Sequence, residues 1–202
     1  MLLFARTRRW GALGMVVAVS ATVVLLCGPF AIALNPTGEG LVRVALLVPL
    51  LPGVAIAAAL ATPLAAQERV ASREIRAYRA AHVVLSTVLA AAVLAGAAVL
   101  LAPADGAAVA QQGPLSMVRN VLALTGAGVI GYRMLGSQLG WAVPVVWVIL
   151  PPLLMPRPDQ DRLQIFTLVN QPDGAITASA FACAVWIVAV WVTGALRDPA
   201  GR

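Results

Sequence analysis

One segment of the sequence matches a nucleotide-binding motif. Residues 126–131, GAGVIG, have the GxGxxG spacing with which a glycine-rich turn approaches the pyrophosphate of a dinucleotide, and they follow an apolar run at residues 121–125. A dinucleotide fold also needs a strand–helix–strand unit and an acidic residue about 20 positions later. The next acid is Asp159, and strands and helices do not alternate elsewhere. We therefore interpret these glycines as helix-packing residues.

Glycine at a helix interface lets two backbones approach closely inside a membrane, and a GxxxG pair at residues 136–140 adds to the same pattern. The residues predicted to serve helix packing are Gly126, Gly128, Gly131, Gly136 and Gly140.

Residue types suited to catalysis or metal binding are sparse. The sequence has no GxxxxGK[ST] loop for ATP, one histidine (His82), and two cysteines (Cys27 and Cys183) that lie apart within apolar blocks. No acid falls inside an apolar block, where a proton-coupled transporter would place one. We therefore predict no catalytic residue, metal or cofactor in this chain. The acids are Glu39, Glu68, Glu74, Asp105, Asp159, Asp161, Asp173 and Asp198.

The most polar stretch, residues 65–79, contains no glycine or proline and is predicted to be helical. Arg69, Arg73 and Arg76 are spaced i, i+4 and i+7, so they share one helix face. Two interpretations stay open: a basic loop that meets anionic lipid head groups, or a docking surface for a cytoplasmic partner. The residues predicted for such docking are Glu68, Arg69, Arg73, Glu74 and Arg76.

Three polar residues mark the apolar block at residues 115–135. Arg119 and Asn120 stand near its beginning and Arg133 near its end. An arginine at the centre of a membrane costs about 2.5–3.5 kcal/mol on insertion scales. Near the ends it reaches the interface with its long side chain, so interfacial anchoring is the first interpretation and lining of a cavity the second.

The composition predicts the class of protein that must position these residues. Of the 202 residues, 61% are hydrophobic and 11% charged, far from the roughly one quarter charged that is typical of soluble domains. A spanning helix needs about 20 mostly apolar residues. We predict an all-α, polytopic transmembrane helix bundle that forms a single domain over residues 1–202. The six predicted spans are about 11–34, 41–64, 80–101, 115–135, 139–154 and 175–196, with a cytoplasmic loop at 65–79 and an outer loop at 155–174.

Arginine placement predicts the orientation. The net charge is +6, and all 14 basic residues are arginine. If the N-terminus is cytoplasmic, ten arginines fall on the cytoplasmic side and four outside, which agrees with the positive-inside rule and places both termini in the cytoplasm. This placement explains the charge without a nucleic-acid partner. The four outer arginines are Arg43, Arg119, Arg157 and Arg162.

This plan resembles the membrane subunits of type-two ATP-binding-cassette exporters, which have six spans, both termini inside, a coupling helix between spans two and three, and a partly re-entrant segment between spans five and six. The resemblance places the coupling helix at residues 67–79 and the outer segment at 159–173. The strings RNVLALTG (119–126), RMLG (133–136) and WAVP (141–144) also look like small permease-like proteins of GC-rich bacteria. The resemblance to these families implies that the chain lies in a bacterial plasma membrane. It also implies a separate P-loop ATPase subunit and a second permease subunit, identical or different.

Two functions from different classes follow. The first is a permease subunit that moves a substrate with energy from the separate ATPase. The alternative is a non-transporting assembly, immunity or regulatory subunit, which needs only a face that binds its partner. A membrane enzyme would require a polar constellation that the sequence does not display.

Overall fold

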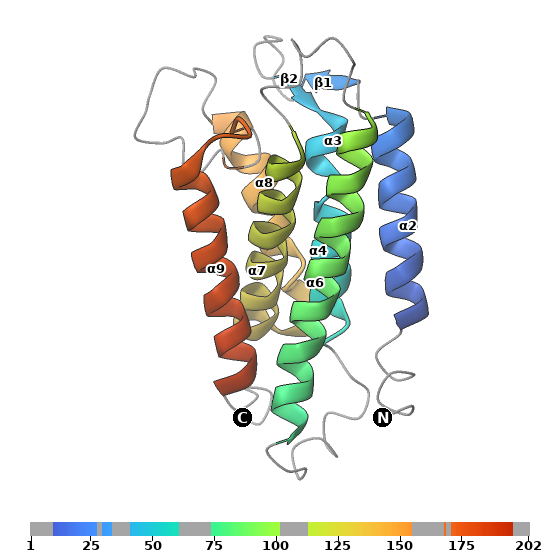
Figure 1. Cartoon of the computed structure of the whole chain (residues 1–202). Coiled ribbons are helices and arrows are strands. Elements are labelled where there is room, and N and C mark those ends of the chain that lie inside the picture. Colours follow the sequence, from blue (N-terminus) through green and yellow to red (C-terminus); the bar gives the residue numbers. More distant parts are fainter. Residues whose placement is uncertain are drawn as a thin grey trace.

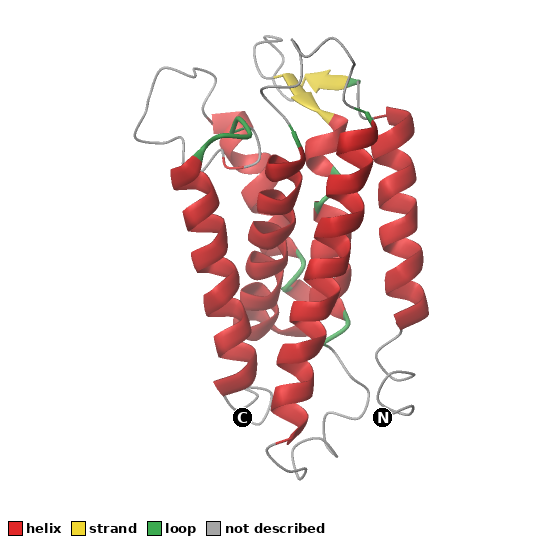
Figure 2. Ribbon diagram, viewed as in Figure 1, coloured by secondary structure: helices red, strands yellow, loops and turns green. Residues whose placement is uncertain are grey.

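A computed structural model describes residues 10–27, 30–33, 41–60, 74–101, 113–154, 168 and 171–195. Within these residues the chain is helical apart from one pair of short antiparallel strands (Figure 2). The elements are α2 (Trp10–Cys27), β1 (Ala31–Ala33), β2 (Leu41–Arg43), α3 (Val44–Leu47), α4 (Leu50–Ala58), α6 (Glu74–Leu100), α7 (Pro114–Leu139), α8 (Ala142–Leu154) and α9 (Ile176–Ala195).

The helices lie side by side in an elongated bundle (Figure 1). Successive helical segments alternate in direction: α2, α6 and α8 run toward the end that carries the strands, and α4, α7 and α9 run away from it. As a result α2 begins and α9 ends at the same end of the bundle. We call this the basal end and the opposite one, with β1 and β2, the strand end.

The predicted all-helical bundle is confirmed, but the described helices differ in length. Four are long and apolar enough to cross a membrane: Trp10–Cys27, Ala77–Leu100, Pro114–Leu139 and Ile176–Gly194. The other two predicted spans correspond to shorter apolar helices, at Val44–Ala58 and Ala142–Pro151.

The observed helix bounds differ from the predicted bounds of the first two spans. Helix α2 ends at Cys27 instead of continuing to Leu34, and residues 31–33 pair with residues 41–43, Ile32 opposite Val42. Gly28 and Pro29 follow Cys27 in the sequence, and both disfavour continuation of a helix. The second segment is divided into α3 and α4 at Val48 and Pro49, since proline lacks the N–H that an unbroken helix requires.

Helices α7 and α8 are joined by a tight turn. Gly136, near the end of α7, has φ 78° and ψ −177°, a backbone conformation open almost only to glycine. The helix bends there, and α8 begins six residues later at Ala142. The predicted boundary between spans four and five, at residues 136–138, therefore falls at the observed bend.

Helix α7 is the centre of the bundle. It contacts α4, α6, α8 and α9, and 72% of the residues in its most apolar stretch are buried, against 22% in α2 and α9. One apolar cluster joins α7 to α6 and α2 through Met117, Leu94 and Val17. A second joins it to α6 and α9 through Val83, Val129 and Ala189. Ser116, Arg119, Asn120 and Thr125 of α7 are thus buried among neighbouring helices.

Candidate functional site

The N-terminus of α7 is capped by a residue from the turn before α9. Gly113 occupies the N-cap position and has no side chain to offer, while Pro114 fits the first helical position because its missing N–H needs no partner. The backbone N–H of Ser116 donates instead to Oδ1 of Asp173, at 2.5 Å and 57 residues away in sequence. A negative charge at this position also complements the helix dipole.

Gly113 makes room for that carboxylate. A Cβ atom at this position would lie 2.5 Å from Oδ2 of Asp173. The backbone of Gly113 has φ −87°, which any residue can adopt, so the need for glycine here is steric.

Arg119 lies three residues after Ser116 on α7, and its side chain contacts the same loop before α9. Its side chain is 2% exposed. Nη1 donates to the carbonyl oxygen of Pro172 at 2.8 Å and Nη2 to that of Gln171 at 2.6 Å. The carboxylate of Asp173 is near enough for its negative charge to act on the guanidinium. We call the set of Ser116, Arg119, Gln171, Pro172 and Asp173 the α7–α9 clamp.

The clamp offsets the charge of a buried arginine. Hydrogen bonds that involve an ionised group are about twice as strong as neutral ones. Arg119 makes two of these and has a carboxylate nearby, whereas an uncompensated arginine would carry the insertion cost of about 2.5–3.5 kcal/mol. The arrangement is therefore an internal network of charges and hydrogen bonds. Its backbone acceptors occupy two guanidinium donors of Arg119 that could otherwise bind a ligand.

Arg133 lies at the other end of the same helix pair. Fourteen residues separate it from Arg119, close to four helical turns, so both face α9. Its Nη2 donates to the carbonyl oxygen of Val192 at 3.0 Å. The two arginines are about 21 Å apart along the axis and share no common site. Asn120, the third residue predicted to line a cavity, is fully buried next to Arg119.

Between the two arginines, glycine sets the distance from α7 to its neighbours. A Cβ at Gly126 would lie 2.9 Å from Cγ1 of Val185 and 3.1 Å from Cα of Trp186. A Cβ at Gly128 would lie 3.0 Å from the Cβ of Ala57 in α4. These two glycines stand at close crossings with α9 and α4.

The other three predicted packing glycines serve the α7–α8 turn. A Cβ at Gly131 would lie 2.5 Å from the carbonyl oxygen of Gly140, and one at Gly140 would lie 2.5 Å from Cα of Tyr132. Gly136 has no atom within 4 Å of such a Cβ, so it supplies a backbone conformation and packs against no partner helix. The predicted Gly136–Gly140 contact pair therefore divides into two roles.

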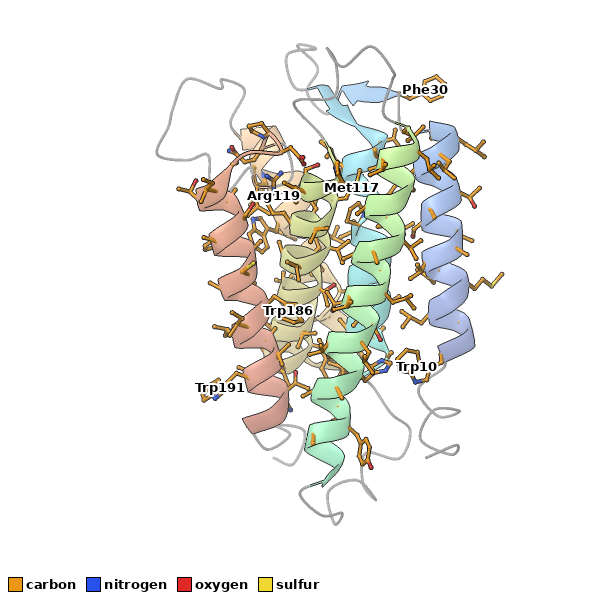
Figure 3. The ribbon with its side chains drawn as sticks, in the orientation of Figure 1. Trp10, Phe30, Met117, Arg119, Trp186 and Trp191 are labelled. Carbon is orange, nitrogen blue, oxygen red and sulfur yellow. The ribbon has the colours of Figure 1, made fainter. Side chains whose placement is uncertain are left out.

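A second polar contact crosses the bundle near its middle. Nε1 of Trp186 in α9 donates to Oγ1 of Thr87 in α6 at 3.3 Å, and Thr87 donates to the carbonyl oxygen of Val83 at 2.6 Å. Figure 3 shows Trp186 lying against the bundle, whereas Trp191, five residues further along α9, points away from it. Residue type and spacing gave no sign of this contact.

The distribution of polarity decides the class of the protein. Apolar side chains point outward on the peripheral helices: Met15 is 70% exposed and Ile176 82%. Buried positions, in contrast, include polar groups such as Arg119, Asn120 and Thr125. Water does not tolerate so much exposed apolar surface, whereas lipid does, and four of the described helices are long and apolar enough to cross a membrane. The chain is a helical membrane protein.

No protein-family model, no curated protein and no solved structure matches this membrane protein.

The predicted docking residues are described only in part. Glu68, Arg69 and Arg73 lie outside the described residues. Glu74 and Arg76 belong to the first turn of α6, whose backbone continues unbroken to Leu100. Residues 74–79 are thus the beginning of the third helical segment of this membrane protein, where the sequence predicted a separate loop helix.

Sequence reasoning missed the acid of the clamp. Asp173 stands in the sequence Pro172-Asp173-Gly174, a turn signal directly before an apolar helix, and that signal indicates a loop and no more. Its partner is 57 residues away, a pairing that only the packing of α7 against α9 establishes. Within the described residues, no group of three His, Cys, Asp or Glu side chains is placed to hold a metal ion.

Proposed function

We propose that the chain is the permease subunit of an ATP-driven exporter in a bacterial plasma membrane. In this proposal the six helical segments are six spans, both termini are cytoplasmic, and a separate P-loop ATPase supplies the energy. A second permease subunit, identical or different, completes the pathway.

The observation that carries the proposal is the placement of the second connection. Helix α4 ends and α6 begins at the basal end, where α2 also begins and α9 ends (Figure 1). The intervening sequence holds Arg69 and Arg73, and Arg76 follows in the first turn of α6. A basic connection on the side of both ends of the bundle supports a cytoplasmic basal end and a surface on which an ATPase can push.

The distribution of acids supports an external energy source. Among the described helices the only acidic residue is Glu74, at the basal end of α6. Proton-coupled transporters use carboxylates or histidines within the membrane as relays. The described helices offer no such carboxylate, and their buried histidine, His82 of α6, packs edge-on against Trp10 of α2. In this proposal, ATP hydrolysis by a partner takes the place of the proton gradient.

The test is co-purification. A tagged chain is isolated in mild detergent from its native host, and a P-loop ATPase is sought in the complex by mass spectrometry. Charge reversal of Arg69, Arg73 and Arg76 to glutamate should release the ATPase, because the docking face changes sign. Reversal of Arg157 and Arg162, assigned to the opposite side, is the matched control and should leave the complex intact. Retention of the ATPase by the first variant would refute the docking assignment.

One observation favours the non-transporting alternative. Helix α7 is enclosed by four helices, is closely packed at Gly126 and Gly128, and is clamped at Arg119. A closely packed centre suits a subunit that serves assembly, immunity or regulation. The ATPase rate of the purified complex separates the two functions: a permease subunit makes that rate respond to transported substrate, whereas a regulatory subunit sets a rate that substrate does not change.

A further inference from the structure

The contacts between α7 and α9 differ along their length. At the strand end the two helices are joined by the clamp, whose contacts are three polar hydrogen bonds. In the middle, Gly126 brings α7 against the backbone of α9 at Trp186. At the basal end, Arg133 donates to Val192. Only the strand end depends on a turn, residues 171–175, that precedes the helix.

All three clamp contacts end on consecutive residues of that turn. Arg119 binds the carbonyl oxygens of Gln171 and Pro172, and Ser116 binds the carboxylate of Asp173. A displacement that moves these three residues together would therefore break all three contacts at once. Contacts that are made and lost as one unit define a two-state element, whereas independent contacts would weaken gradually.

The closed arrangement is also incompletely satisfied. A guanidinium has five N–H donors, and within the described residues the buried Nε of Arg119 has no acceptor. A buried donor without a partner costs about 1–3 kcal/mol. This cost offsets part of the clamp's stability and brings an open arrangement, in which Arg119 is solvated, closer in free energy.

We propose that the α7–α9 clamp is a conformational latch. When the latch is closed, the strand ends of α7 and α9 are held together; when the turn at residues 171–175 moves, they separate while the close crossing at Gly126 stays as the pivot. The latch is a property of the fold and holds for a transporting and for a non-transporting subunit alike.

Double electron–electron resonance, which measures the distance between two spin labels, tests the latch directly. Cys27 and Cys183 are first replaced by serine. Labels are then placed on Leu115 and Ile176, exposed residues at the strand ends of α7 and α9, and the protein is studied in lipid nanodiscs. A second labelled pair, Met134 and Trp191, reports the basal ends. Both pairs are measured in the parent and in two clamp variants, Arg119→Gln and Asp173→Ala, the second of which removes the oxygen that accepts from the Ser116 N–H.

The parent should give one narrow distance population for the strand-end pair. Each clamp variant should add a second, longer population there and leave the basal pair unchanged. Arg133→Gln, which removes a polar contact at the other end, is the matched control and should not lengthen the strand-end distance. If both clamp variants keep the helical circular dichroism of the parent and the strand-end distance stays single and unchanged, the latch does not exist.

A structural role without a latch gives a different result. If the clamp only stabilises the fold, its removal broadens the distance distributions of both label pairs together, and that result also overturns the proposal. The combined variant Arg119→Gln/Asp173→Ala should open the strand end no further than either single variant, because loss of the contacts of either residue already frees the turn.

Discussion

At the scale of single residues, Arg119 and Arg133 both lie on α7, and each meets a different kind of neighbour. Arg119 is buried against a turn and an acid, whereas Arg133 is half-buried with a helix carbonyl as acceptor. Because both residues lie near an end of an apolar block, we predicted that both long side chains can anchor at the membrane interface. The acceptors available to each depend on the neighbouring helix, which residue type does not encode.

Replacement of Gly113 by alanine tests the steric part of the clamp. The new methyl group would meet Oδ2 of Asp173 at 2.5 Å, so the carboxylate must leave its position at the N-terminus of α7. We expect the free energy of unfolding to fall by about 1–2 kcal/mol, the usual cost of a lost cap. Asp173→Ala should cost a similar amount, and the double variant hardly more, since both changes remove one contact. Thermal denaturation in detergent micelles measures all three.

Gly14→Ala is the control for this series. Gly14 is exposed on α2 and no atom lies within 4 Å of an added Cβ, so alanine should be neutral or slightly stabilising. Full additivity of Gly113→Ala and Asp173→Ala would show that the two residues do not act on each other.

At the scale of elements, every apolar block predicted a helix, and the errors lie where prolines and glycines interrupt the blocks. Pro49 divides the second block, and Gly28 with Pro29 follows the early end of α2. Hydrophobicity alone fixes neither boundary, because it measures transfer into lipid and not backbone hydrogen bonding. The strand pair escaped prediction for a related reason: six residues in two short strands give no periodic signal.

The candidate site was predictable only in its parts. A glycine-rich segment at residues 126–131 indicated close packing without naming the partner, and Gly126 meets α9 while Gly128 meets α4. The hydrogen bond from Trp186 to Thr87 joins residues 99 apart. Contacts of this kind depend on which helices are neighbours. A local sequence pattern does not predict which helices of a bundle are adjacent.

The α7–α9 crossing makes an element-scale prediction. Gly126→Ala should lower the free energy of unfolding by about 1–3 kcal/mol, because the added Cβ overlaps Val185 and the backbone of Trp186 and forces the helices apart. Gly96→Ala, on the exposed side of α6 with open space around it, is the matched control and should raise stability by about 0.5–1 kcal/mol. Both are measured from the thermal loss of helical circular dichroism. Equal effects of the two substitutions would contradict a close crossing.

At the scale of the whole molecule, the alternating directions of the six helical segments make the orientation of the bundle testable. In the proposed topology the basal end is cytoplasmic, and the connections at the strand end face outward. Arginine counts support this orientation, and the structure supplies the shared end of α2 and α9.

Cysteine accessibility measures the topology. In a background without Cys27 and Cys183, single cysteines at Thr37 and Asn170 should react with a membrane-impermeant maleimide in intact cells. Cysteines at Ala5 and Ala200 should react only after the cells are permeabilised. Labelling of Ala200→Cys in intact cells would place the C-terminus outside the cell and would contradict the proposed even number of spans.

The two shortest helical segments have a consequence for the surrounding lipid. Val44–Ala58 and Ala142–Leu154 extend about 22 Å and 20 Å at 1.5 Å per residue, against a hydrocarbon thickness of about 30 Å. They also lie next to each other: α4 contacts α8, and the space at Gly128 is bounded by both. The described helices on this side are therefore shorter than the bilayer is thick, whereas α2 and α6 are about 27 Å and 40 Å long. We expect the membrane to thin on that one side, and a partner or a second copy with a similarly short flank to relieve the deformation by covering it.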